Sequence, residues 1–121
     1  MEDAGASADI GTLIIVDNFV EADDLKDAFE RHRMGPVLHI RSVDIARAML
    51  AETGHHPQLV VVGVSVGAAT TEALIDEQRN RGGRVLVLNG PPPEAVPPLT
   101  AHLARPYGDD DLTRAILRLM G

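Results

Sequence analysis

Several polar side chains that can bind ions stand directly after short apolar runs of the sequence. Asp17 and Asn18 follow one such run, Asn89 follows another and Arg105 follows a third, while Gly63 stands at the end of a fourth. A carboxylate is a ligand for hard cations, and a guanidinium binds oxyanions through paired N–H groups. If these runs are parallel strands, their carboxyl ends meet at one edge of a sheet, where we expect the polar groups to gather.

A serine-based site is a second chemical possibility. The stretch Gly63 to Gly67 reads G-V-S-V-G and matches the G-x-S-x-G nucleophile elbow, and Asp76 and His102 follow Ser65 in the chain order of a hydrolase triad. However, Asp76 falls inside an expected helix, and a chain of 121 residues leaves little room for a substrate pocket or lid. We keep a small hydrolase that uses Ser65 as an alternative, and we interpret the glycines as allowing a tight loop.

Metal and cofactor sites have little support in the sequence. The chain has no cysteine, which excludes disulfides and cysteine-based metal centres. His55 and His56 are adjacent and lack a third ligand at a useful spacing, and the triplet Asp109 to Asp111 stands where acids would favour the start of a helix. Neither of the glycine-rich nucleotide-binding patterns occurs. We therefore predict no cofactor and no metal.

The elements that would position these residues can be read from the hydrophobic pattern. Short apolar runs predict strands at 12–16, 37–40, 59–62, 85–88 and 102–104, and helical spacing with cap signals predicts helices at 21–33, 42–52, 67–81 and from 109 onwards. Between the last two strands, residues 90–98 contain five prolines, so any helix there must be short or displaced.

The alternation of these elements predicts the fold class. Strands and helices that alternate form parallel sheets with right-handed crossovers and helices on both faces. We expect an α/β protein with a five-stranded parallel sheet, a (βα)5 arrangement of the flavodoxin-like type. The acidic, small-residue start of the chain predicts a flexible tail at 1–11, followed by a single domain at 12–121.

Four segments of the chain together resemble the receiver domain of bacterial two-component response regulators. They are L-I-I-V-D-N at 13–18, P-Q-L-V-V-V-G-V-S-V at 57–66, R-V-L-V-L-N-G at 84–90 and L-A-R-P-Y-G-D-D-D-L at 103–112. The resemblance extends from about Thr12 to Met120, and the segments occur in the order and at the spacing typical of the family.

The resemblance implies a phosphorylation pocket that lacks residues needed for phosphoryl transfer. Asp17 matches the first of two metal-binding acids, but Asn18 replaces the second, and Gly63 stands at the position of the phosphoacceptor aspartate. Asn89 replaces the hydroxyl residue, and Arg105 replaces the lysine that binds phosphoryl oxygens. We therefore expect no phosphorylation at this position, and we expect Asp17 and Arg105 to pair across the vacant pocket.

The resemblance also implies a switch and output face. His102 falls near the position of the family's rotating aromatic residue, and Arg105-Pro106 resembles a Lys-Pro pair whose peptide bond is usually cis. Tyr107 follows at the start of the last connection. A histidine at this position can titrate near neutral pH, but a partly exposed polar residue on a short strand is the simpler interpretation of His102.

Charge and composition narrow the choice of partner. The formal net charge is −7, which disfavours nucleic acids and anionic membranes, and no apolar stretch is long enough to span a membrane. There is no signal peptide pattern at the start, and the absence of cysteine is compatible with the reducing conditions of the cytoplasm. We predict a cytoplasmic protein that binds another signalling protein, such as a histidine kinase, a regulator or an output domain, or that forms a homodimer.

Taken together, these features predict an atypical receiver domain that signals by protein–protein interaction and is not an enzyme. Two alternatives remain open at this stage. One is the small hydrolase that uses Ser65, and the other is a small-ligand sensor, because flavodoxin-like sheets bind ligands at the carboxyl ends of their strands.

Overall fold

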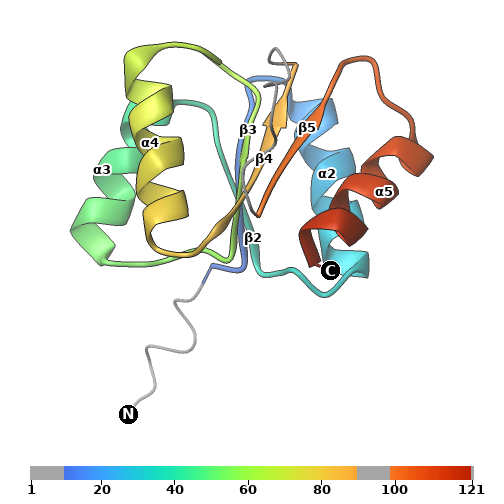
Figure 1. Ribbon diagram of the computed structural model, residues 1–121, viewed down its shortest axis with the longest axis horizontal. Coiled ribbons are helices and arrows are strands. Elements are labelled where there is room, and N and C mark those ends of the chain that lie inside the picture. The colour runs from blue at the N-terminus through green and yellow to red at the C-terminus, as the bar shows by residue number, and fades with distance from the viewer. Residues whose placement is uncertain (1–9, 90–98, 121) are drawn as a thin grey trace.

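The computed structural model describes residues 10–89 and 99–120. These residues form one parallel five-stranded sheet and four helices (Figure 1). In chain order the elements are β1 (Thr12–Ile15), α2 (Phe19–Arg31), β2 (Val37–Ile40), α3 (Val43–Thr53), β3 (Leu59–Val62), α4 (Ala69–Asn80), β4 (Arg84–Leu88), β5 (Thr100–Leu103) and α5 (Asp109–Met120).

The strand order is β2-β1-β3-β4-β5, and every neighbouring pair is parallel. This is the flavodoxin-like order, so the predicted fold class is confirmed. Within it, β1 lies between β2 and β3, with Leu13 opposite both Leu38 and Val60. The order of connection reverses beside β1, and the carboxyl ends of β1 and β3 therefore open the crevice at which such folds place their sites.

Two helical layers cover the sheet, α2 and α5 on one face and α3 and α4 on the other (Figure 1). Because successive side chains of a strand point to opposite faces, β1 supplies both cores. Ile14 packs with Phe29 and Ile116 beneath α2 and α5, whereas Leu13 and Ile15 belong to the cluster beneath α3 and α4. The central strands β1 and β3 are thus buried on both faces, as their continuous apolar runs predicted, whereas the edge strand β2 is only partly buried.

Side-chain caps define where three of the helices begin. Asn18 accepts a hydrogen bond from the backbone N–H of Glu21 at the start of α2, and Ser42 accepts one from Ile45 at the start of α3. At α5, the carboxylate of Asp111 accepts a hydrogen bond from the backbone N–H of Gly108, at 2.9 Å. The acidic triplet that contains Asp111 therefore supplies a helix cap, as predicted.

Some boundaries differ from the sequence prediction. Strand β5 begins at Thr100 and not at residue 102, because Thr100 is already in register with Val85 of β4. Helix α4 begins at Ala69 and not at 67, since Gly67 has a φ of +95°, which a right-handed helix does not allow. Helix α2 starts two residues earlier than predicted, at Phe19, because Asn18 is its cap.

Two other expectations fall partly on residues that the structure does not describe. The fifth helix of a (βα)5 arrangement would lie within 90–98, outside the described residues, as do residues 1–9 of the expected tail. Ile10 packs against the core and Gly11 is buried, with its N–H bonded to the carbonyl oxygen of Pro36. In the described part of the chain, no helix has the length and apolar character needed to cross a membrane.

Candidate functional site

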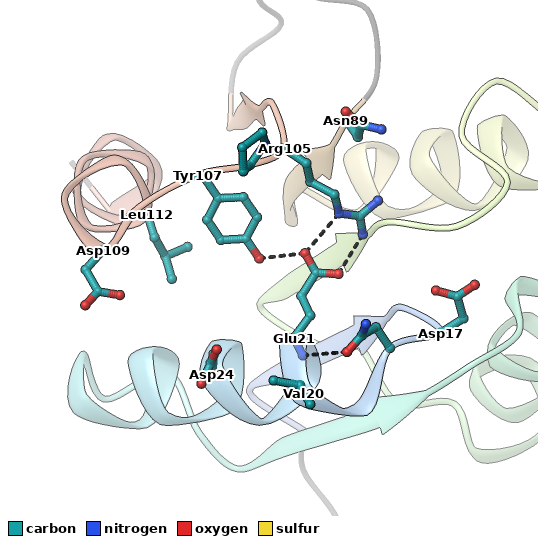
Figure 2. Close-up of a pocket in the computed structure, with 11 residues that line it drawn as sticks. Asp17, Val20, Glu21, Asp24, Asn89, Arg105, Tyr107, Asp109 and Leu112 are labelled. Carbon is teal, nitrogen blue, oxygen red and sulfur yellow. Dashed lines mark hydrogen bonds and ion pairs between the residues drawn. The ribbon is translucent and has the colours of Figure 1, made fainter.

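An open groove of about 780 Å³ lies at the carboxyl edge of the sheet, between the first turn of α2 and the segment that joins β5 to α5 (Figure 2). We call it the edge groove. Its lining consists of Asp17, Asn18, Val20, Glu21, Asp24, Asn89, Arg105, Pro106, Tyr107, Asp109 and Leu112. Four of the five residues that the resemblance placed in the phosphorylation pocket are among them, and the fifth, Gly63, lies buried beside Arg105.

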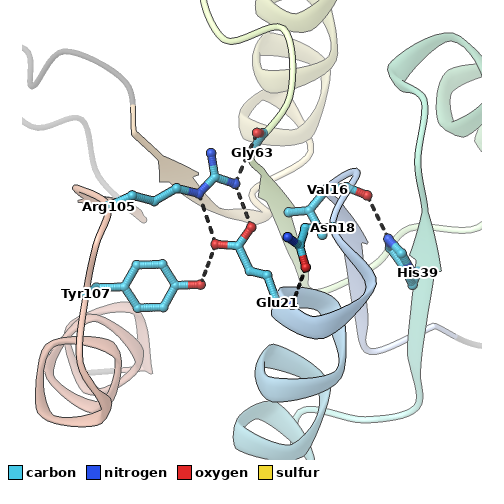
Figure 3. Close-up of polar contacts among 7 residues, drawn as sticks. All are labelled: Val16, Asn18, Glu21, His39, Gly63, Arg105 and Tyr107. Atoms are coloured by element: carbon cyan, nitrogen blue, oxygen red, sulfur yellow. Dashed lines mark hydrogen bonds and ion pairs between the residues drawn. The ribbon is translucent and has the colours of Figure 1, made fainter.

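The centre of the groove is an ion pair between Glu21 and Arg105 (Figure 3). Nε of Arg105 donates to one carboxylate oxygen of Glu21 at 2.9 Å, and Nη2 donates to the other at 2.7 Å. The hydroxyl of Tyr107 donates a third hydrogen bond to the same carboxylate, at 2.8 Å. The expected pairing of Asp17 with Arg105 is therefore wrong, because the bidentate face of the guanidinium already holds Glu21.

The guanidinium of Arg105 also lies directly against the backbone of Gly63. Nη2 donates to the carbonyl oxygen of Gly63 at 3.2 Å. A Cβ atom built on Gly63 would lie 2.5 Å from this Nη2 and 2.8 Å from Cγ1 of Val16. Such distances are too short for real carbon contacts, so the arginine occupies the space that a side chain at residue 63 would need.

The electrostatics of this cluster favour its charged form. Burial alone would raise the pKa of Glu21, but the hydrogen bonds from Arg105 and Tyr107 and the charge of Arg105 together hold that pKa below its ordinary value. The bond to Glu21 raises the pKa of Arg105 in turn. Burial and the neighbouring carboxylate raise the pKa of Tyr107 well above its usual range, so the phenol keeps its proton and serves as a donor.

Glu21 was not among the candidate residues from the sequence, although a local signal for it exists. It is the third residue of α2 after the Asn18 cap, the position at which a glutamate usually turns back to the N–H of the cap residue. Here its backbone N–H bonds to Asn18, while its side chain reaches across to Arg105. The pattern N-x-x-E marks the helix start, but nothing in it indicates a partner 84 positions away.

The remaining pocket residues have different surroundings. Asp17 and Asn89 are exposed and line the groove, and Asn89 has a positive φ of 61°. The side-chain oxygen of Asn18 is engaged as a helix cap. Among the described residues, no group of three or more histidine, cysteine or acidic side chains is arranged to hold a metal ion.

The three residues predicted for the switch face do not all lie together. Pro106 follows a cis peptide bond and lines the edge groove with Tyr107. His102 instead lies on β5 opposite Val87, on the sheet face covered by α4. Its Nδ1 is buried and has no hydrogen-bond partner among the described residues. Burial, followed by the nearby charge of Arg79, lowers the pKa of His102.

The hydrolase alternative gains no support from the geometry. Ser65 is exposed with a φ of +52°, as a tight turn requires. Within the described residues, however, no hydrogen bond joins Ser65 to either candidate partner. Asp76 lies on α4 and forms an ion pair with Arg79 at 3.0 Å. The acid, base and nucleophile of a triad are therefore not brought together.

The fold and the position of the groove define the class: the chain has the flavodoxin-like α/β fold found in signal receiver domains. One similar structure is the signal receiver domain of a signal transduction histidine kinase from Syntrophus aciditrophicus. Its TM-score is 0.67 at 21% identity, over 91% of this chain and 89% of that one.

A second similar structure is SdrG from Pseudomonas melonis Fr1 in its BeF3-activated conformation. Its TM-score is 0.64 at 20% identity, over 94% of this chain and 99% of that one. No protein-family model matches the sequence, and no curated protein matches it. At this level of identity the likeness establishes the fold, and arguments about function depend on the groove.

Proposed function

We propose that this protein is a receiver-like module of two-component signalling that acts by binding a partner protein, without being phosphorylated and without catalysing a reaction. Its fold is that of signal receiver domains, two of which align over nearly the whole chain. The edge groove lies at the carboxyl edge of the sheet, where folds of this class place their functional groups.

The observation that carries the proposal is the contact between Arg105 and Gly63. Residue 63 has no side chain to accept a phosphoryl group, and the space beside it is filled by the guanidinium. That guanidinium, the group expected to bind phosphoryl oxygens, is already neutralised by Glu21. The position expected for the acceptor therefore has no nucleophile, and the cation expected to bind phosphoryl oxygens is paired with Glu21.

In this proposal the partner is a signalling protein, either a histidine kinase, another regulator or an output domain, and the setting is the cytoplasm. A second copy of the chain is a further candidate. Because its pocket is held by an internal ion pair, the module presents one surface to its partner and has no phosphorylation-dependent change to make.

An amide NMR titration with Mg²⁺ and then beryllofluoride, a phosphoryl mimic, tests phosphorylation independence. We expect the resonances of Asp17, Gly63, Asn89 and Arg105 to stay in place. A receiver domain that retains its acceptor aspartate, titrated in the same buffer, shows that the mimic is active. Saturable shifts of these four resonances would overturn the proposal and would call for a phosphotransfer assay.

A further inference from the structure

The edge groove has the shape and charge of a docking surface, and we propose that it binds a segment of a partner protein in which lysine or arginine side chains stand next to apolar ones. The inference rests on the proposed function, because it identifies the chemistry of the partner that such a module would bind.

The apolar part of the groove contains one highly exposed aliphatic side chain. Val20, in the first turn of α2, is 72% exposed, although it is a large aliphatic residue. Pro106 also contributes to the lining. Across the groove lie the partly buried ring of Tyr107 and the side chain of Leu112, which is itself buried in the core (Figure 2). An aliphatic or long-stemmed side chain that entered between these walls would remove Val20 from water, which is the usual source of binding energy at an interface.

The polar part of the groove carries an excess of negative charge. Among the described residues, the lining contains four carboxylates, from Asp17, Glu21, Asp24 and Asp109, and one cation, Arg105. The charge of Arg105 is taken up by its bidentate pair with Glu21. Within the described part of the chain, the carboxylates of Asp17, Asp24 and Asp109 have no hydrogen-bonded or ion-paired partner, so three negative charges face the groove.

The internal ion pair makes this arrangement rigid. Glu21 is held by three hydrogen bonds from two residues, and Arg105 is fixed further by the carbonyl oxygen of Gly63. The ion pair and Tyr107 therefore form a prearranged part of the groove lining, next to the unpaired carboxylates of Asp17, Asp24 and Asp109. A prearranged surface loses less conformational entropy on binding than a mobile one.

Charge complementarity distinguishes among the kinds of molecule that could bind in the groove. A phosphate, a nucleic acid or an acidic peptide would be repelled by the three carboxylates. A second copy of this chain carries a formal net charge of −7, so its docking in this groove, as distinct from another face of the protein, would meet the same repulsion. A basic side chain with an aliphatic stem satisfies both parts of the groove at once, because its stem covers Val20 while its charged end reaches the carboxylates.

The test uses the full chain and a blocked pentapeptide of sequence KLKLK, followed by amide NMR. We expect saturable shifts at Val20, Tyr107, Asp109 and Leu112, and no such shifts with the matched peptide ELELE. The variant D24N/D109N should weaken binding about tenfold, since it removes two of the groove's charges. Its melting temperature, compared with that of the wild type, shows that it remains folded.

The control variant E30Q/E52Q removes the same number of charges from exposed residues outside the groove. It should bind KLKLK as tightly as the wild type. Equal weakening in both variants would overturn the inference, because binding would then follow net charge alone. Binding of ELELE at the groove would also overturn it, as would a concentration-dependent dimer in sedimentation that excludes KLKLK from the groove.

The two proposals fail separately. If KLKLK does not bind and beryllofluoride causes no shifts, the inference of a basic partner is overturned, while the proposal of phosphorylation independence still stands. Saturable shifts with beryllofluoride would overturn the proposal of phosphorylation independence, whatever the result with the peptide.

Discussion

Glu21 and Arg105 are 84 positions apart in the chain, and their side chains meet in two hydrogen bonds of 2.9 and 2.7 Å. The pair joins the first turn of α2 to the segment between β5 and α5, and Arg105 extends the connection to Gly63 at the end of β3. Three segments that converge on one edge of the sheet are therefore held by one guanidinium.

Placing an aspartate at residue 63 should not make the protein a phosphoacceptor. In Gly63→Asp the new Cβ would collide with Nη2 of Arg105 and with Cγ1 of Val16. We expect a loss of about 1–3 kcal/mol in the free energy of unfolding, in line with other overpacked sites. Urea denaturation measures the loss, and incubation with acetyl phosphate followed by intact-mass analysis tests phosphorylation.

Gly108→Ala is the matched control for this substitution. The nearest atom to a Cβ at Gly108 is a side-chain oxygen of Asp111 at 3.8 Å, an ordinary contact. We expect its stability to stay within about 0.5 kcal/mol of the wild type. A Gly63→Asp protein as stable as this control, or one that gains the mass of a phosphoryl group, would contradict our account of the Arg105 contact.

The Glu21–Arg105 pair should show measurable coupling. In a double-mutant cycle of Glu21→Gln and Arg105→Gln we expect a coupling energy on the order of 1 kcal/mol or more, because the pair is bidentate and partly buried. The neighbouring-turn pair Asp76–Arg79 provides the comparison, and we expect about 0.2–0.5 kcal/mol for it. Equal coupling energies from urea denaturation would show that the first pair is no more than a surface contact.

The stability of the protein should depend on Glu21 in acid. The pKa of Glu21 is lowered in the folded state, so the folded protein binds fewer protons there than the unfolded chain does. The stabilisation is therefore complete above the ordinary value of 4.5 and is lost as the pH falls through the lower folded-state pKa. Unfolding free energies of the wild type and Glu21→Gln should converge as the pH falls below 4.5, and a constant difference across the acid range would rule this out.

Much of the fold was predictable from local patterns, because β1 and β3 are almost wholly apolar runs and three helices begin at side-chain caps. Runs such as T-L-I-I and L-V-V-V are long enough to be recognised and are bounded by turn residues. The first residue of β5 could not be predicted from the local sequence. Thr100 is polar by type but buried, and its place is set by pairing with β4, which no local window contains.

The site was predictable only in outline. Parallel strands bring their carboxyl ends together, so the grouping of Asp17, Asn89 and Arg105 follows from the fold. The identity of the residue that pairs with Arg105 depends on which acidic side chain is long enough, and points in the right direction, to reach the guanidinium. Glu21 extends from a helix across the groove, whereas Asp17, which the sequence suggested, remains exposed beside it.

The dependence among residues 21, 63 and 105 also limits how the protein can change by single mutations. An aspartate at residue 63 collides with Arg105, and removing Glu21 first would leave a partly buried guanidinium without its counter-charge. Each first step towards a pocket with an aspartate at residue 63 therefore destabilises the protein before any benefit. On this reasoning an acceptor at residue 63 needs at least two substitutions made together, so single mutations alone do not lead to it.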